Sequence, residues 1–218
     1  MLSVGIIGNG PDALLPELSH YKDKVDIWIG ADRGAYVLAA NKIPIDYAVG
    51  DFDSITAAEK AAIIQHAISI EEFPSEKDET DLEIALNKAF MLHPERIYLF
   101  GVTGGRLDHE LINIQLLYLI EDKGIHGYIV DKTNQLEMIS PGSYTILRDE
   151  MYPYISFIPY TKTVEGIHLT GFYYPLTEAD ISWGSTLCIS NKLLSKSGTF
   201  SFEKGILLLV KSCDAIQA

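Results

Sequence analysis

The chain has 218 residues, of which 47% are hydrophobic, enough to bury one large core or two small ones. Its formal net charge of −13 argues against nucleic-acid backbones and anionic membrane surfaces as partners, because like charges repel. The two cysteines lack a C-x-x-C spacing and no apolar run approaches the ~18 residues of a membrane span, so we expect a cytoplasmic protein without disulfides.

Short apolar runs rich in Ile and Val recur through the first 140 residues and are bounded by Gly, Asp or Pro, as expected of buried strands. Helical patterns lie between these runs. Capping boxes predict helix starts at Thr56 and at Thr80, and apolar spacing predicts a third helix over 111–120. This alternation predicts an α/β fold with a mostly parallel sheet flanked by helices. The predicted strands are 4–7, 27–30, 47–49, 67–71, 96–100 and 127–130.

The pattern changes near Ser140, where short pieces rich in Tyr, Thr, Ile and Phe begin. Such pieces, separated by Gly and Pro, predict an antiparallel β-sandwich or barrel. The charge changes as well, since residues 1–140 carry −12 and residues 141–218 carry −1. We therefore expect two domains, 1–140 and 141–218. The strands predicted for the second are 144–147, 154–158, 163–169, 186–189, 199–202 and 206–211.

Four acidic motifs lie where predicted strands end or a predicted helix begins. The carboxyl ends of parallel strands meet at one crevice, where open α/β folds bind ligands, so we expect these carboxylates to converge. Clustered carboxylates repel one another unless a cation is present, and the pattern therefore predicts a metal-dependent phosphate site. The motifs are Gly-Ala-Asp-Arg-Gly at 30–34, Gly-Asp-Phe-Asp-Ser at 50–54, Asp-Glu-Thr-Asp at 78–81 and Thr-Gly-Gly-Arg-Leu-Asp-His at 103–109.

Asp51 and Asp53 are two residues apart after the strand predicted at 47–49. In an extended segment both side chains point to one side, within reach of one hard cation. The same pattern is typical of an Asx turn in which one aspartate caps the next helix. Both interpretations remain open at this point.

Asp81 lies in the first turn of a predicted helix, beside the expected N-cap Thr80. The helix dipole alone favours an acid there by ~0.3–1 kcal/mol. With Asp78 and Glu79 beside it, more negative charge gathers than one helix end needs, which favours a metal or a cationic substrate.

Residues 103–106, Thr-Gly-Gly-Arg, follow the strand predicted at 96–100. Paired glycines let the backbone approach a ligand, N–H groups at a helix start bind phosphate, and Arg106 adds a bidentate donor. The alternative is a tight turn with a surface arginine. A second candidate phosphate loop, Gly-Asn-Gly-Pro at 8–11, is also typical of an ordinary turn.

Asp108 and His109 follow this loop and allow two interpretations. They could serve metal binding and proton transfer. Equally, Asp108 could cap the helix while His109 and Asn113 form a surface pair at i,i+4 spacing.

Taken together, these motifs resemble the thiamine pyrophosphokinase family, and their order and spacing cover nearly the whole chain. The resemblance implies an N-terminal α/β catalytic domain that binds ATP and metal, a C-terminal β-sandwich that binds thiamine, and a homodimer with active sites at the subunit interface. It also implies Mg²⁺-dependent transfer of the diphosphoryl group of ATP to the thiamine hydroxyl, giving thiamine diphosphate and AMP. The matching segments are 8–11, 31–35, 50–54, 78–81, 103–109 and 189–191.

The resemblance also implies roles for individual residues. Either Asp32 or Asp81 would take the proton of the thiamine hydroxyl. Ser190 and Asn191 would line the thiamine pocket. The metal ligands would be Asp51, Asp53, Asp81 and, as a further candidate, Asp78. The ATP-binding residues would be Asn9, Gly10, Thr80, Thr103, Gly104, Gly105, Arg106, Asp108 and His109.

The chain departs from the family pattern at two places. Some members have a second Gly where this chain has Arg33, which adds either a phosphate contact or a surface charge. Relatives in animals place a Trp in the last strand to stack on thiamine, whereas this chain has Ile-Leu-Leu-Leu at 206–209, and Trp183 is one candidate replacement.

Three other functions are compatible with the same residues. A diphosphokinase for another alcohol, such as a pterin, would use the same catalytic domain. A non-catalytic thiamine- or nucleotide-binding protein would need the pocket without the metal carboxylates. A two-metal phosphohydrolase would release phosphate instead of transferring it.

Overall fold

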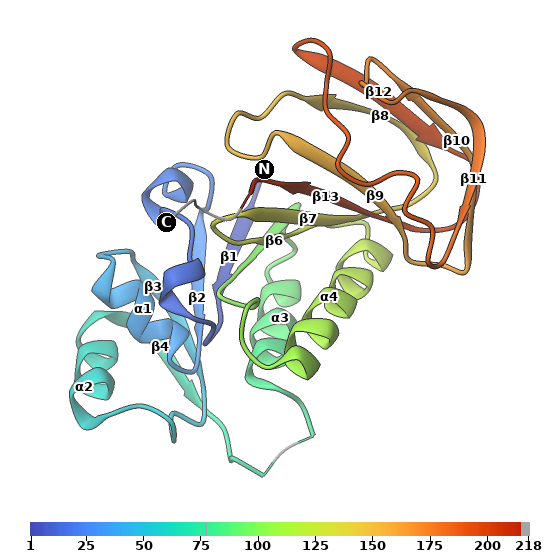
Figure 1. Ribbon diagram of the computed structural model, residues 1–218. Coiled ribbons are helices and arrows are strands. Elements are labelled where there is room, and N and C mark those ends of the chain that lie inside the picture. Colours follow the sequence, from blue (N-terminus) through green and yellow to red (C-terminus); the bar gives the residue numbers. More distant parts are fainter. Residues whose placement is uncertain (77, 215–218) are drawn as a thin grey trace. The chain divides into compact units, whose positions relative to one another are not determined.

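Six strands of the first part of the chain pair in parallel, in the order β4-β3-β2-β1-β5-β6 (Figure 1). The chain adds strands outward from β1 on one side and from β5 on the other, so the strand order reverses between these two neighbours. Open α/β sheets bind ligands at such a reversal, beyond the carboxyl ends of the strands. The strands are β1 Ser3–Ile7, β2 Ile27–Ala31, β3 Ile45–Gly50, β4 Ala67–Glu72, β5 Arg96–Phe100 and β6 His126–Val130.

The computed structural model describes residues 1–76 and 78–214, and the chain divides into two compact units at Lys132 and Thr133. The first unit contains the parallel sheet, and the second is all β. The division comes before the strand at 134–139, whereas the sequence pattern placed it after residue 140. Every helix in the described ranges is too short or too polar to cross a lipid bilayer.

Two helix starts in the first unit have side-chain caps, at Thr56 and Thr80, whereas the N-cap residues Arg33 and Arg106 make no side-chain cap. Thr56 and Glu59 form the predicted capping box, and the Thr80 hydroxyl accepts a hydrogen bond from the Glu83 N–H at 3.2 Å. The third helix begins earlier than its apolar spacing predicted, at Leu107. The helices are α1 Gly34–Ala40, α2 Ala57–His66, α3 Asp81–Met91 and α4 Leu107–Asp122, with 3₁₀ turns at Asp12–Leu14 and Leu18–Tyr21.

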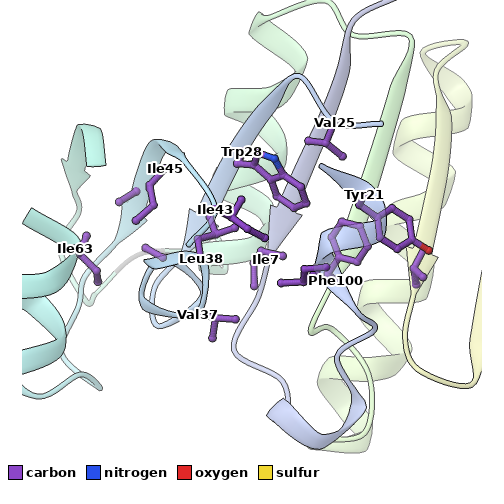
Figure 2. Packing of buried hydrophobic residues seen from close by; sticks show 14 of the residues in the cluster. Ile7, Tyr21, Val25, Trp28, Val37, Leu38, Ile43, Ile45, Ile63 and Phe100 are labelled. Carbon is purple, nitrogen blue, oxygen red and sulfur yellow. The ribbon is translucent and has the colours of Figure 1, made fainter. Parts of the chain in front are cut away.

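The core of the first unit joins strands and helices that lie far apart in the sequence (Figure 2). Trp28 of β2 stacks on Phe100 of β5 with ring centroids 5.8 Å apart, and Tyr21 meets the same phenylalanine edge-on at 4.8 Å. Leu38 of α1 and Ile63 of α2 bury their side chains in this cluster. This packing fixes the carboxyl ends of the strands, from which the polar loops extend.

The second unit is an antiparallel sandwich, with sheet orders β7-β13-β9 and β11-β10-β12-β8. Its core includes Phe157 from the first sheet and Phe200 from the second, with ring centroids 4.9 Å apart. Cys188 is a residue of this core, and its burial raises the pKa of the thiol to about 11. The strands are β7 Asn134–Ile139, β8 Gly142–Leu147, β9 Tyr154–Pro159, β10 Thr163–Thr170, β11 Leu176–Ser182, β12 Ser197–Phe202 and β13 Leu207–Ser212.

One predicted strand of this unit, 186–189, is wrong: the residues form turns, and the edge strand β11 lies just before them. The Cys188 carbonyl nonetheless accepts a hydrogen bond from the Phe157 N–H at 2.9 Å. Cys188 is buried against β9 in this way, whereas its neighbours Leu187 and Ile189 are 58% and 45% exposed, so the segment is a loop anchored at one residue.

Candidate active site

A cavity of about 540 Å³ opens at the carboxyl ends of β1, β2, β3 and β5 and at the starts of α3 and α4. It lies at the strand-order reversal and gathers residues from all four acidic motifs. The predicted residues that line it are Asn9, Gly10, Asp32, Asp51, Thr80, Asp81, Thr103, Gly105, Arg106 and His109. Lining residues that the sequence did not point to include Ser75, Glu110 and Asn113.

The two glycine loops lie against each other at this cavity. The Gly10 N–H donates to the Gly101 carbonyl at 2.6 Å, and a Cβ on Gly10 would lie 2.6 Å from that oxygen, so only glycine fits. Thr103 also lines the cavity, and its hydroxyl donates to the buried Asp131 carboxylate at 2.9 Å. The close backbone approach leaves the side chain of Asn9 and the backbone of Gly105 at the cavity.

Asp32 is the most deeply buried of the predicted acids, with 7% exposure, and its backbone is left-handed, with φ of 50°. Its Oδ2 accepts a hydrogen bond from the Ser54 hydroxyl at 2.5 Å. Its Oδ1 is buried and has no hydrogen-bond partner among the residues that the structure describes. A buried carboxylate oxygen in this state is costly, so the site suits a ligand that supplies a cation or a donor.

Asp51 and Asp53 form the turn of the second interpretation but not its helix cap. The Asp53 N–H donates to Asp51 Oδ1 at 3.2 Å, which is an Asx turn, while Thr56 and not an aspartate caps the helix that follows. The negative charge of Asp51 raises the pKa of Asp53 above its usual value, and Asp32 adds to this effect. Like charges held this close favour a bound cation.

Asp81 is the first residue of α3 and lines the cavity together with Thr80. Asp78 is exposed and is not a lining residue. Of the three acids of this motif, Glu79 and Asp81 line the cavity and Asp78 does not.

Arg106 and Asp108 form an exposed bidentate ion pair, with Nη2 and Nε of Arg106 at 2.5 and 3.1 Å from the two carboxylate oxygens. Asp108 raises the pKa of Arg106, and Arg106 lowers the pKa of Asp108. The guanidinium is thereby oriented at the cavity edge, where its remaining N–H groups can donate to phosphate oxygens.

Two neighbours of this pair have different roles from those considered in the sequence. The Gly104 N–H donates to the Glu110 carboxylate at 2.9 Å, and the lining glycine is Gly105. Asn113 is buried and donates to the Val102 carbonyl at 2.9 Å, so the surface pair with His109 is wrong. Asn113 instead fixes the loop that precedes α4.

Ser190 and Asn191 lie in the second unit. Asn191 is 2% exposed, and its side chain accepts from the Tyr174 and Lys192 N–H groups and donates to the Tyr174 carbonyl, at 2.8–3.0 Å. Ser190 is exposed, with a left-handed φ of 56°, and its N–H donates to the Ser156 hydroxyl. The amide of Asn191 is thus used to hold the segment, while the Ser190 hydroxyl faces solvent.

Two family models match the chain. Residues 18–129 match the model described as thiamin pyrophosphokinase, catalytic domain, and residues 143–207 match the one described as thiamin pyrophosphokinase, vitamin B1 binding domain. Thiamine pyrophosphokinase of Bacillus subtilis (strain 168) is 46% identical over 215 residues, which cover 98% of this chain and 100% of that protein.

Solved structures agree with these matches. The crystal structure of thiamine pyrophosphokinase from Bacillus subtilis aligns with a TM-score of 0.92 at 45% identity, covering 98% of this chain and all of that one. Thiamin pyrophosphokinase from Candida albicans aligns with a TM-score of 0.83 at 18% identity, covering 97% of this chain and 89% of that one. At this lower identity the likeness concerns the fold.

Proposed function

Because this chain belongs to the thiamine pyrophosphokinase family, we propose that its crevice binds ATP with Mg²⁺ and delivers the diphosphoryl group to the hydroxyl of thiamine. The activity is that of a thiamine pyrophosphokinase, a transferase of the kinase type that produces thiamine diphosphate. The observation that carries the proposal is the cavity at the strand-order reversal, which brings carboxylates from three separate loops together with Arg106.

A phosphate-bound Mg²⁺ suits this donor set. In the described ranges, no three Asp, Glu, His or Cys side chains are close enough to enclose a metal by themselves. Mg²⁺ usually keeps several waters and takes one or two carboxylates together with substrate phosphates. We propose that its one or two carboxylate ligands come from Asp51, Asp53 and Asp81, of which Asp51 and Asp81 line the cavity while Asp53, like Asp78, lies outside its lining. Bound there, the ion would neutralise charge on the transferring phosphates.

The chain's own residues would position the reactants. Arg106, the Gly105 backbone and the Asn9–Gly10 loop would hold the phosphates of ATP, so that the β-phosphorus faces the thiamine hydroxyl. The hydroxyl oxygen forms a bond to the β-phosphorus, the bond from that phosphorus to the bridging oxygen of AMP breaks, and AMP leaves. A carboxylate takes the hydroxyl proton, and both candidates, Asp32 and Asp81, line the cavity.

Thiamine is the acceptor that the second unit supports, because this unit matches a vitamin B1 binding model. We propose that the exposed Ser190, whose N–H donates to the Ser156 hydroxyl, contacts thiamine, and that the buried Asn191 fixes the adjoining backbone at Tyr174 and Lys192. Trp183 is 70% exposed, with its indole N–H donating to the Tyr160 carbonyl, and is a candidate stacking surface. The permanent positive charge of thiamine also suits an acidic protein.

Product analysis tests the function directly. The purified chain, incubated with ATP, Mg²⁺ and thiamine, should form thiamine diphosphate and AMP in equal amounts, measured by ³¹P NMR and mass spectrometry. A pterin alcohol in place of thiamine should give no transfer. Binding without product would instead support a sensor, and release of free phosphate or pyrophosphate would support a hydrolase.

We also propose that the active protein is a cytoplasmic homodimer. Both cysteines are free thiols, in keeping with a reducing compartment. Light scattering during turnover should give about twice the 24.2 kDa mass of one chain, and an active monomer would contradict the proposal. The large apolar side chains exposed on α4, which a second copy could cover, are Leu107, Leu111, Ile112, Tyr118 and Leu119.

A further inference from the structure

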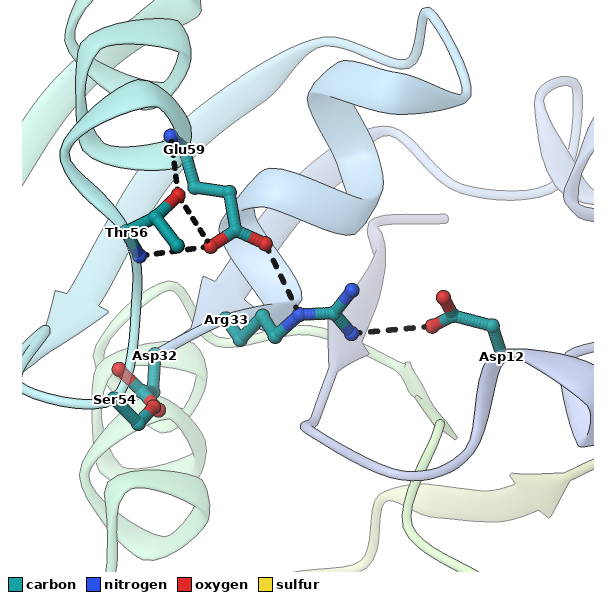
Figure 3. A network of polar contacts seen from close by, with 6 residues as sticks. All are labelled: Asp12, Asp32, Arg33, Ser54, Thr56 and Glu59. Atoms are coloured by element: carbon teal, nitrogen blue, oxygen red, sulfur yellow. Dashed lines mark hydrogen bonds and ion pairs between the residues drawn. The ribbon is translucent and has the colours of Figure 1, made fainter.

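Arg33 follows the crevice residue Asp32 but does not line the crevice. Its side chain is 29% exposed and runs between two carboxylates, one from the 3₁₀ turn at Asp12–Leu14 and one from the first turn of α2 (Figure 3). Nε donates to Glu59 Oε1 at 3.2 Å, and Nη1 donates to Asp12 Oδ1 at 3.3 Å. The guanidinium carbon also lies 5.8 Å from the ring centroid of Tyr36. Its charge is therefore engaged by protein groups, unlike the phosphate contact or free surface charge considered from the sequence.

Glu59 connects Arg33 to the segment that follows β3. Its other oxygen, Oε2, accepts from the Thr56 N–H at 2.8 Å and from the Thr56 hydroxyl at 2.9 Å, completing the capping box. Both oxygens of this carboxylate are thus used, and the start of α2 is fixed to Arg33 at the same time.

A second connection runs parallel to this one. The Ser54 hydroxyl donates to Asp32 Oδ2 at 2.5 Å, so the adjacent residues Asp32 and Arg33 hold residues 54–59 at both ends (Figure 3). The segment begins directly after Asp51 and Asp53. Their position relative to Asp32 therefore depends on these two contacts as well as on the sheet.

The second contact of Arg33, from Nη1 to Asp12, reaches the loop after β1. Asp12 begins the 3₁₀ turn that follows the Gly8–Pro11 loop, and the backbone of this loop contacts the loop after β5. Arg33 thus joins the loops after three neighbouring strands, β1, β2 and β3. Asp12 is exposed and Glu59 is partly buried, and ion pairs near the surface typically contribute little to overall stability, so geometry is the property that these two pairs can control.

We propose that Arg33 is a positioning residue, which holds segment 50–56 and segment 8–14 in register around Asp32 through Glu59 and Asp12. The effect on metal rests on the proposed function, because it concerns how well Asp51 and Asp53 receive a Mg²⁺–ATP complex. Residues that orient metal ligands from behind typically change metal affinity 10–100-fold when they are lost.

Arg33→Met removes the hydrogen bonds to both Glu59 and Asp12 while keeping an aliphatic side chain. We expect the half-saturating Mg²⁺ concentration in the assay to rise about tenfold, with a smaller change in kcat. Binding of Mn²⁺ in the presence of α,β-methylene-ATP, measured by electron paramagnetic resonance without turnover, should weaken by a similar factor. Amide hydrogen exchange should become faster in segments 8–14 and 50–56 specifically.

Matched variants separate positioning from general damage. Arg33→Lys can pair with only one carboxylate at a time and should restore part of the metal affinity. Glu59→Gln should reproduce the loss in segment 50–56 without affecting segment 8–14. Arg148→Met breaks an exposed ion pair with Glu150 in the second unit and should leave metal dependence, exchange and activity unchanged.

The proposal is overturned if Arg33→Met leaves Mn²⁺ binding unchanged, or if exchange in both segments matches that of the original protein. A fall in thermal stability and activity without a change in Mg²⁺ dependence would also overturn it, since that is the mark of a merely structural role. The proposed function fails separately, if the unaltered protein makes no thiamine diphosphate, because the exchange and Mn²⁺ measurements need no turnover.

Discussion

Replacement of Asp51 by asparagine is expected to lower kcat for thiamine diphosphate formation by at least about a hundredfold, the scale of losing one charge-stabilising group in an active site. Asn keeps the size of the side chain and an oxygen that can accept the Asp53 N–H, now at 3.2 Å, so the turn should persist. What is lost is the negative charge facing the cavity, which a Mg²⁺–ATP complex would need. Steady-state product formation at saturating Mg²⁺ measures the effect.

The thermal stability of the same variant should not fall with its activity. Asp51 raises the pKa of Asp53, so the folded chain holds that proton to higher pH than the unfolded chain does. This repulsion destabilises the fold as the pH rises above the unfolded pKa, and removing the Asp51 charge relieves it. Without Mg²⁺ at pH 7, the melting temperature should therefore stay the same or rise.

Asp23→Asn is the control, because Asp23 is exposed and lies outside the cavity lining. It should leave both kcat and the melting temperature unchanged. Full activity of the Asp51 variant would exclude Asp51 as a metal ligand. A lower melting temperature in parallel with the lost activity would indicate that Asp51 acts mainly on the fold.

Gly34→Ala should be the most destabilising small substitution near the site. A Cβ on Gly34 would overlap the carbonyl oxygen of Ile7, so either the end of β1 or the start of α1 must shift. Overpacking of this kind costs typically ~1–3 kcal/mol, and more where backbone blocks the added atom. Urea unfolding followed by circular dichroism should show a lower midpoint with an unchanged slope.

Gly105→Ala supplies the comparison for this measurement. A Cβ on Gly105 meets nothing within 4 Å, and its backbone has no left-handed φ, so the unfolding midpoint should not fall. Equal midpoints for the two variants would contradict the close approach of α1 to β1. A lower unfolding midpoint for Gly34→Ala alone would support this close approach, which also fixes the backbone next to Arg33.

The fold class could be predicted because its signals are local. Thr56 and Glu59 are three residues apart and form their capping box within one helical turn. The apolar runs of the parallel strands are likewise continuous in the sequence, and they match the observed strands to within a few residues. The convergence of Asp32, Asp51 and Asp81 followed from the parallel arrangement, because the carboxyl ends of the strands and the start of α3 meet at one edge of the sheet.

Other features depend on contacts that no local pattern encodes. Strand β7 pairs with β13, more than 60 residues later, and therefore belongs to the second unit. The division between the units accordingly lies at Lys132 and not after residue 140. Asn191 and Asn113 are ordinary polar residues in the sequence, and only burial beside unpaired backbone groups makes them structural.

By itself the sequence determined the alternation of strands and helices, the capping residues and the set of polar motifs, because these depend on residues within a turn or two of one another. The tertiary structure decided which of these polar groups face the cavity and which are used to hold it. Arg33 illustrates the difference: its partners Asp12 and Glu59 lie 21 and 26 residues away, and only the folded sheet brings both within hydrogen-bond distance.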